Sequence, residues 1–165
     1  MYTNIIVACD FNKVIGDGLK IPWSIRDDMK FFRKTTMNCN VIMGRKTFES
    51  LDCQALDGRN NIVITSKALK YREEKLNGKY DDFIFEDNIE SSLTSCIPDV
   101  DTFVIGGAEI YKAFLERDYV KKCFISLVKR TFFGDVLFPN LGPDWVIDSL
   151  TDYEDFTLLE MRRII

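Results

Sequence analysis

Apolar residues fall in two alternating patterns along this chain. Short runs rich in β-branched residues, such as 4–9 and 102–106, are typical of buried strands. Stretches such as 26–36 and 108–116 repeat apolar residues at the spacing of an amphipathic helix. The pattern predicts strands over 4–9, 40–43, 61–65, 82–85, 102–106, 122–130, 145–150 and 156–162, and helices over 26–36, 47–51, 88–96 and 108–116.

Two of these helices carry a polar residue suited to their first position. Thr47 and Asn88 are the expected N-caps, because their side chains can accept a hydrogen bond from a free backbone N–H. The polar stretch 66–80 has no clear assignment, and the segment that follows the strand 4–9, through Trp23, is expected to be a glycine-containing loop.

Strand–helix alternation over the first two thirds of the chain predicts a parallel sheet built from crossover units. Strands follow one another without helices in the last third, so we expect them to add antiparallel edge strands. The chain contains no repeat or linker, and its 165 residues fit one domain, residues 1–165. The expected fold is a three-layer α/β domain.

Composition excludes several classes of function. The chain is 46% hydrophobic and 29% charged, as in soluble globular proteins, and no apolar run or N-terminal signal indicates a membrane or secretion. Five cysteines without metal-type spacing are typical of free thiols in a reducing compartment, so we expect a cytoplasmic protein. A net charge of −4 argues against a nucleic-acid partner. The absence of histidine excludes Ser-His-Asp and Cys-His catalysis and the usual zinc sites.

The stretch "IPWSIRDDMKFF" places two acids beside an aromatic pair. On the predicted helix, Asp28 has Phe31 and Phe32 as its i+3 and i+4 neighbours, whereas Asp27 pairs with the exposed Lys30. The opposite side of the helix carries only charged side chains, those of Arg26, Lys30 and Arg33. Asp28 should therefore face the apolar side, where a carboxylate is costly unless it is paired, metal-bound or used in chemistry.

Two strand-to-helix junctions are suited to phosphates. In "VIMGRKTFES", Gly44, Arg45 and Lys46 stand at a helix start, which favours an anion. In "FVIGGAEIYKAF", Gly106 and Gly107 let a ligand approach the backbone closely. Neither junction has the full Rossmann fingerprint, and a tight turn or an exposed basic pair explains each one alone. Two such junctions on one parallel sheet favour a ligand at the carboxyl ends of its strands.

A third basic segment, "GRNNIVITSK", places Arg59 before a strand and Lys67 after it. Clustered with Arg45 and Lys46, Lys67 would make a local anion site on an acidic protein. The alternative from the pattern alone is a set of unrelated solvated cations.

The ordered motifs "VIGDGLKIPW", "DDMKFF", "VIMGRKTFESL", "GRNNIVITS", "FVIGGAEIY" and "GDVLFP" resemble the dihydrofolate reductase family from end to end. The resemblance implies a central, mostly parallel eight-stranded sheet with about four flanking helices. It implies reduction of 7,8-dihydrofolate to 5,6,7,8-tetrahydrofolate by hydride transfer from NADPH, inhibition by antifolates, no metal and a monomer. The short interval between Trp23 and Asp28 is bacterial-like.

The resemblance also implies roles for individual residues. Asp28 would orient the pterin and promote its protonation, with Trp23 and Ser126 as the other catalytic residues. Substrate binding would fall on Ile6, Val7, Ala8, Asp28, Met29, Phe32, Leu51, Leu56, Arg59, Ile105, Tyr111 and Ser126. Cofactor binding would fall on Ala8, Ile15, Gly16, Gly18, Leu19, Ile21, Gly44, Arg45, Lys46, Thr47, Thr65, Ser66, Lys67, Ile105, Gly106, Gly107, Ala108, Glu109, Ile110 and Tyr111.

Further expectations follow from the resemblance. The Gly106–Gly107 peptide should be cis, and the loop from Gly16 to Trp23 resembles a lid over the nicotinamide. Ser126 stands where the family usually has threonine, and the region around "KYDDF" matches poorly, so the adenine pocket stays unassigned.

Two other classes of protein differ from this assignment in residues that the sequence can test. A riboflavin-pathway reductase of the same fold would lack the acid at Asp28. A non-catalytic nucleotide-binding module would have lost Asp28, Arg59 or the Gly106–Gly107 pair, all of which are present.

Overall fold

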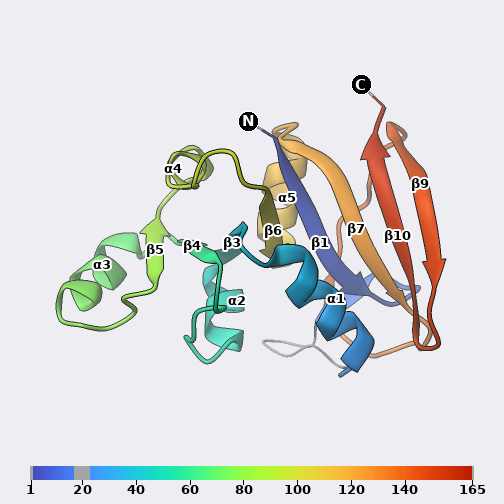
Figure 1. The fold of residues 1–165 in the computed structure, drawn as a ribbon, viewed down its shortest axis with the longest axis horizontal. Helices are drawn as coiled ribbons and strands as arrows, with labels where there is room; N and C mark the ends of the chain where they lie inside the picture. Colours follow the sequence, from blue (N-terminus) through green and yellow to red (C-terminus); the bar gives the residue numbers. More distant parts are fainter. Residues whose placement is uncertain (1, 17–22, 165) are drawn as a thin grey trace.

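The computed structural model describes residues 2–16 and 23–164, and a central twisted sheet runs through it (Figure 1). Eight strands form this sheet: β1 (Thr3–Cys9), β3 (Asn40–Gly44), β4 (Asn60–Ile64), β5 (Phe83–Glu86), β6 (Thr102–Gly106), β7 (Val120–Val128), β9 (Trp145–Asp152) and β10 (Phe156–Arg163). The helices of the described residues are α1 (Arg26–Thr36), α2 (Arg45–Ser50), α3 (Ala68–Leu76), α4 (Ile89–Thr94) and α5 (Ala108–Glu116). A separate two-stranded sheet pairs β2 (Val14–Gly16) with β8 (Val136–Leu137).

The strand order is β5-β4-β3-β6-β1-β7-β10-β9, and the pairs from β5 through β7 are parallel. The strand β10 runs antiparallel to both of its neighbours, β7 and β9. The predicted fold class is therefore confirmed, and the antiparallel edge is limited to β9 and β10. Strand β7 is parallel to β1, because α5 supplies the crossover that precedes it.

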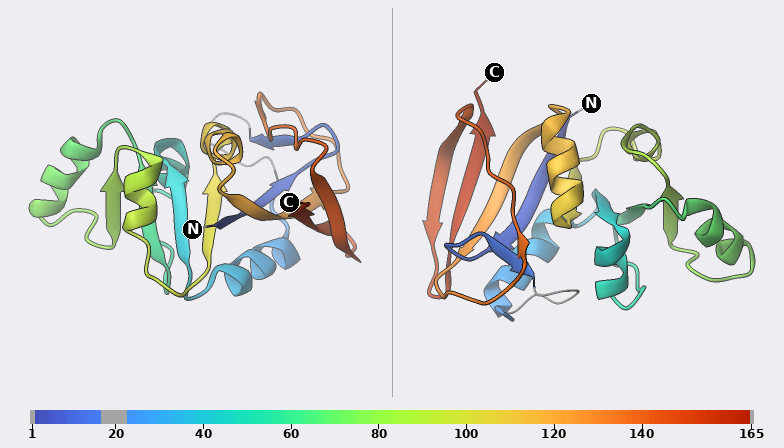
Figure 2. Two further views of the ribbon diagram at one scale, coloured as in Figure 1. Left: turned by 90° about the horizontal axis from the view of Figure 1, so that it is seen from above. Right: turned by 180° about the vertical axis from the view of Figure 1, so that it is seen from behind.

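Apolar side chains on the two faces of the sheet form two cores. Alternation along β3 sends Ile42 to one core, with Phe114 of α5, and Val41 to the other, with Phe48 of α2. Figure 2 shows α1 and α5 on opposite sides of the sheet. On the α1 side, the rings of Phe31 and Phe124 lie 6.4 Å apart. Helices thus cover both faces, as the three-layer prediction requires.

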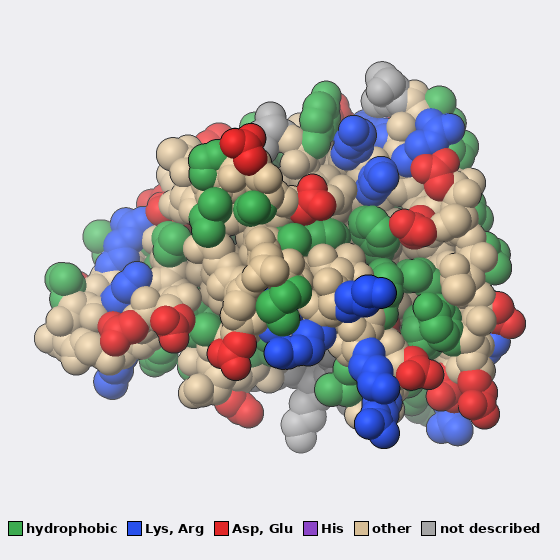
Figure 3. All heavy atoms as spheres, viewed as in Figure 1, with side chains coloured by type: hydrophobic (Ala, Val, Ile, Leu, Met, Phe, Trp, Pro, Cys, Tyr) green, Lys and Arg blue, Asp and Glu red, His purple; other side chains and the backbone are tan. Residues whose placement is uncertain are grey.

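Charged side chains of both signs are spread over the face seen in Figure 3, with smaller hydrophobic areas between them. Among the described residues, no helix is both long enough and apolar enough to cross a bilayer. The five cysteines, Cys9, Cys39, Cys53, Cys96 and Cys123, are all free.

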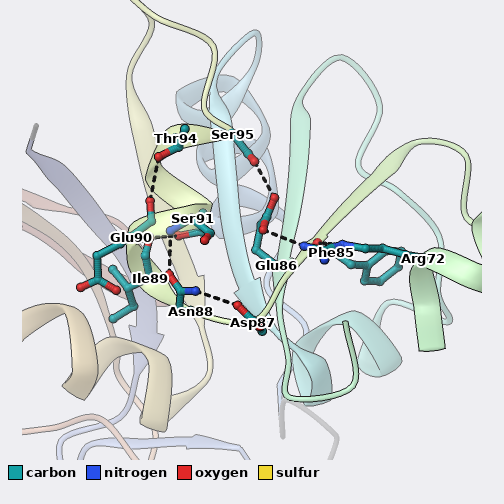
Figure 4. Close-up of polar contacts among 11 residues, drawn as sticks. Arg72, Phe85, Glu86, Asp87, Asn88, Ile89, Glu90, Ser91, Thr94 and Ser95 are labelled. Carbon is teal, nitrogen blue, oxygen red and sulfur yellow. Dashed lines mark hydrogen bonds and ion pairs between the residues drawn. The ribbon is translucent and has the colours of Figure 1, made fainter. Parts of the chain in front are cut away.

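The predicted cap of α4 is present in the structure. Asn88 accepts a hydrogen bond from the backbone N–H of Ser91 at 2.8 Å, as Figure 4 shows. The same region links two helices to β5, because the Glu86 carboxylate accepts hydrogen bonds from Arg72 and from the Ser95 hydroxyl, each at 2.8 Å (Figure 4). The helix ends at Thr94, two residues earlier than predicted.

The prediction that Thr47 caps a helix over 47–51 was wrong. Helix α2 begins two residues earlier, at Arg45, and its N-cap is Gly44, whose backbone is extended. Thr47 is already inside the helix, and its hydroxyl lies beside the Gly106 backbone instead: a Cβ built on Gly106 would be 3.3 Å from Thr47 Oγ1. The helix start is set by the extended strand end, so the hydroxyl is left facing the β6–α5 junction.

Gly134 lies where a side chain has no room, in the segment that leads into β8. A Cβ at this position would be 2.3 Å from the Gly16 carbonyl oxygen and 2.5 Å from Val14 Cγ1. We expect Gly134→Ala to lower the free energy of unfolding by about 1–3 kcal/mol, because β2 must move away. Thermal unfolding measures this change.

Gly142→Ala is the matched control, because no atom of residues 2–16 and 23–164 lies within 4 Å of the Cβ that it would add. Equal changes in melting temperature for the two variants would contradict the close approach of Gly134 to β2.

Candidate active site

A cleft of about 1770 Å³ opens where the parallel strands end. It is lined by the last residues of β1, β3, β4 and β6 and by the first turns of α2 and α5, while α1 forms another wall. Figure 3 shows Lys and Arg side chains gathered in the lower middle of its view, near where Figure 1 draws α1. Free N–H groups at the starts of helices and the ends of parallel strands make this edge suited to an anionic ligand.

Most of the predicted site residues line this one cleft. The predicted substrate residues in its lining are Ile6, Val7, Ala8, Asp28, Met29, Phe32, Leu51, Leu56, Arg59, Ile105, Tyr111 and Ser126. The predicted cofactor residues in its lining are Ala8, Ile15, Gly16, Gly44, Arg45, Lys46, Thr47, Thr65, Ser66, Ile105, Gly106, Gly107, Ala108, Glu109, Ile110 and Tyr111.

Two predicted residues lie outside the lining. Trp23 packs against Phe132, and Lys67 stands just before α3, where its backbone N–H bonds Thr65 Oγ1. Gly18, Leu19 and Ile21 lie outside the described residues, so the predicted lid is seen only at its two ends, Gly16 and Trp23.

Asp28 stands in the first turn of α1 and is half-buried in the cleft, whereas Asp27 is exposed. Burial raises the pKa of the Asp28 carboxyl above its ordinary value, and a hydrogen bond with the Ser126 side chain opposes the rise. Ser126 itself is 2% exposed on β7. The helix phase read from the sequence therefore separates the two acids correctly.

Helix α1 is held against the sheet on the C-terminal side of Asp28. Phe31 packs against Phe124 of β7, and Phe32 lines the cleft. Farther along the helix, the buried Thr36 hydroxyl donates to the Phe32 carbonyl oxygen at 2.8 Å. The contact of Phe31 with β7 and the burial of Thr36 turn the face of α1 that holds Asp28 toward the cleft.

Arg59 is held in place by two hydrogen bonds. Its Nε donates to the Asp57 carbonyl oxygen at 2.9 Å, and its Nη1 donates to Thr36 Oγ1 at 3.1 Å. Burial and the nearby charge of Arg33 lower the pKa of the Arg59 guanidinium, and Asp57 opposes this shift. The remaining N–H groups are suited to a carboxylate, because a guanidinium has five donors.

The other end of the cleft combines glycines with cations. The Gly106–Gly107 peptide is cis, and Gly106 has a φ of 127°, a conformation that favours glycine. Tyr111 ties α5 to β1 by donating to the Ile6 carbonyl oxygen at 2.9 Å. Arg45 forms an ion pair with Glu49 one turn along α2.

Sequence reasoning missed several lining residues: Ser24, Arg26, Lys30, Arg33, Glu49, Ser50, Ile64, Asp135, Val136 and Leu137. The charged stripe of α1 was predicted to lie away from the apolar face. Its members Arg26, Lys30 and Arg33 are exposed, yet they also form a rim of the cleft. Val136 and Leu137 belong to β8, a strand too short for any apolar alternation to reveal.

Comparison with known proteins agrees with this geometry. The family model described as dihydrofolate reductase matches residues 2–157. Three relatives, each named dihydrofolate reductase, are similar over most of the chain. The protein of Buchnera aphidicola subsp. Acyrthosiphon pisum is 36% identical over 88% of this chain and 84% of its own. The Staphylococcus haemolyticus protein is 34% identical over 86% and 80%, and the Bacillus subtilis protein is 32% identical over 88% and 81%.

The family model and the name shared by these three relatives define the protein as an oxidoreductase, and the sheet order and the cleft at its carboxyl edge agree with that class. The chain belongs to the dihydrofolate reductase family. Its chemistry therefore lies in folate metabolism.

Proposed function

We propose that this protein reduces 7,8-dihydrofolate to 5,6,7,8-tetrahydrofolate, with NADPH as the source of hydride. The observation that carries the proposal is the half-buried Asp28 carboxyl, which faces the cleft beside Ser126. A flat heterocycle with an amino and lactam edge is a suitable partner for such a group, because it can donate hydrogen bonds to both carboxyl oxygens.

Asp28 would orient the pterin and favour its protonation through its charge. The pKa of Asp28 lies above its ordinary value, which brings the carboxyl closer to the working range of a proton-transfer group. The Ser126 side chain would fix the carboxyl by the same hydrogen bond that opposes the pKa rise. Water would deliver the proton to the ring nitrogen.

Arg59 would grip the glutamate carboxylate of the substrate. Its guanidinium is already oriented by Asp57 and Thr36, so little rotational freedom is lost on binding. Leu51 and Leu56, which line the cleft, would flank the aminobenzoyl group with apolar surface. The substrate would thus lie between an acid at one end and a cation at the other.

The residues of the other half of the cleft fit a phosphorylated dinucleotide. Arg45, Lys46, Thr47 and Ser66 offer cationic and hydroxyl donors for phosphates. At Gly107, the one atom of the described residues that a Cβ would approach within 4 Å is Thr47 Oγ1, at 3.8 Å, so the backbone is open to close approach. When bound there, NADPH supplies the hydride, and the residues of this chain hold and orient it.

We also propose that residues 1–165 form one domain, which the single eight-stranded sheet supports. A reducing, cytoplasmic location is supported by the free cysteines. Antifolates would compete for the Asp28 end of the cleft, and the protein would act as a monomer.

The purified protein should oxidise NADPH only when dihydrofolate is added, as followed by absorbance of the reduced nicotinamide. Oxidation of NADPH without dihydrofolate would contradict the proposal. So would turnover of a riboflavin-pathway substrate in its place.

Neutralising Arg45 and Lys46 together, by Arg45→Gln and Lys46→Gln, tests the cofactor assignment. We expect the Kd for NADPH to rise by about 10- to 100-fold, because charged hydrogen bonds to phosphate are lost. The Kd for NADH should hardly change, since NADH lacks the extra phosphate. Fluorescence titration measures both constants.

Lys112→Gln is the control for a general charge effect, because Lys112 is an exposed lysine of α5 that lies outside the cleft lining. Equal weakening of NADPH and NADH by the double variant would show that the phosphate lies elsewhere.

A further inference from the structure

Asp10 is a fully buried acid that the proposed chemistry does not use. It follows β1 directly and has 0% of its surface exposed. Three backbone N–H groups donate to its carboxylate: those of Asn12 and Val14 to Oδ1, each at 2.9 Å, and that of Phe132 to Oδ2 at 2.8 Å. A buried carboxylate is tolerated only with such donors, so the backbone of the fold itself holds the Asp10 carboxylate in this place.

The two carboxylate oxygens serve different parts of the chain. Oδ1 closes the turn between β1 and β2, in which Lys13 adopts a φ of 65°. Oδ2 reaches a segment 122 residues away, between β7 and β8. The Lys13 carbonyl oxygen accepts from the N–H of Phe138, which directly follows β8, at 2.7 Å and so ties the β1–β2 turn to β8 as well.

The Phe132 side chain carries this link onward to Trp23. The ring centroids of Phe132 and Trp23 lie 5.1 Å apart, with an interplanar angle of 47°. Such tilted aromatic pairs are favourable beyond their buried area. Trp23 stands just before α1, the helix whose first turn holds Asp28.

We propose that Asp10 is a positioning residue, which acts through the Phe132 backbone and ring to hold Trp23, and with it the start of α1, in the geometry of the reaction. The inference rests on the proposed function. Asp10 is not among the described residues that line the cleft. Its contribution is to fix the segment that supports Trp23, because small misplacements of reacting groups slow a reaction strongly.

Two substitutions separate this role from general support of the fold. In Asp10→Asn, the amide oxygen can still accept from Asn12 and Val14, while the amide NH₂ faces the Phe132 N–H and cannot accept from it. Phe132→Leu leaves the Asp10 carboxylate untouched and removes only the ring against Trp23. Asp148→Asn is the matched control, because Asp148 pairs with Arg162 on the far strands β9 and β10.

The first readout is independent of turnover. In a Trp145→Phe background, Trp23 is the sole tryptophan, since the chain has two. We expect its emission to shift to longer wavelength and its quenching by acrylamide to increase in Asp10→Asn and in Phe132→Leu. Asp148→Asn should leave both quantities unchanged.

The second readout is the single-turnover rate of hydride transfer. We expect this rate to fall by about 10-fold or more in both variants, with a Kd for NADPH within about twofold of the parent. The double variant should be no slower than the slower single variant, because both changes break one chain of contacts.

The proposal is overturned if Asp10→Asn lowers the melting temperature while Trp23 emission and the hydride-transfer rate stay at parental values. If Asp10→Asn does not fold, Phe132→Leu decides, and unchanged Trp23 emission in that variant overturns the proposal. Failure of the proposed function is a distinct result: the parent protein would not turn over dihydrofolate, whereas the fluorescence comparison would still report the link.

Discussion

Asp28→Asn is expected to lower turnover of dihydrofolate by about 10²- to 10⁴-fold, the range of general acid–base contributions. The substitution keeps the shape of the side chain and removes the negative charge that would favour protonation of the pterin. Binding of NADPH should persist, because the cations and glycines of its half of the cleft are untouched. Steady-state rates and NADPH titrations measure the two effects separately.

Asp27→Asn is the matched control, since Asp27 is the adjacent acid and is exposed. We expect this variant to retain nearly all activity. Equal losses of turnover in Asp28→Asn and Asp27→Asn would show that Asp28 acts only by adding negative charge to the start of α1, and not by contact with the pterin.

Asp28→Asn should also change how the stability of the protein depends on pH. Because burial raises the pKa of the Asp28 carboxyl, the folded protein binds its proton more tightly than the unfolded chain does. The favourable contribution of the protonated carboxyl is present below the ordinary pKa and is lost as pH rises through the raised value. Asp28→Asn should therefore gain stability relative to the parent on going from acidic to neutral pH, as measured by urea unfolding.

Arg59→Gln is expected to raise KM for dihydrofolate by about 100-fold with a small change in kcat, because a charged pair with the glutamate carboxylate is lost. The reacting ring lies at the Asp28 end of the cleft, so the chemical step should be spared. A substrate analogue that lacks the glutamate should bind the variant and the parent equally well.

Arg117→Gln serves as the control for lost positive charge, because Arg117 pairs weakly with Glu90 outside the cleft lining. A loss confined to kcat in Arg59→Gln would place the arginine near the reacting atoms and contradict its assignment to the carboxylate.

Much of the sheet could be predicted because its strands are buried on both faces. Runs such as 40–43 and 102–106 are continuous and apolar, and the structure has β3 and β6 there. Helix α3 was missed because only Ala68 and Tyr71 of its residues are buried, which leaves no apolar stripe to detect. The strands β2 and β8 are defined by pairing with each other, and the two paired segments lie far apart in the sequence.

The sequence could predict Asp28 as a site residue, because an acid on the apolar side of a predicted helix is unusual. The hydrogen bonds of Asp10 could not be predicted, because one acid after a strand indicates only a turn. Its third donor, the Phe132 N–H, depends on the fold bringing together segments that are remote in the chain. The arginine and lysine stripe of α1 was read correctly as exposed, but its place on the cleft rim depends on how α1 sits across the sheet.

Contact between the Asp28 carboxyl and the pterin can be measured by carboxyl NMR of protein labelled with ¹³C at the aspartate side chains. The Asp28 resonance, assigned by its absence in Asp28→Asn, should titrate above the ordinary aspartate range in the free protein and shift when folate binds. An Asp28 resonance that titrates as an ordinary exposed aspartate and does not respond to folate would contradict contact between this carboxyl and the pterin.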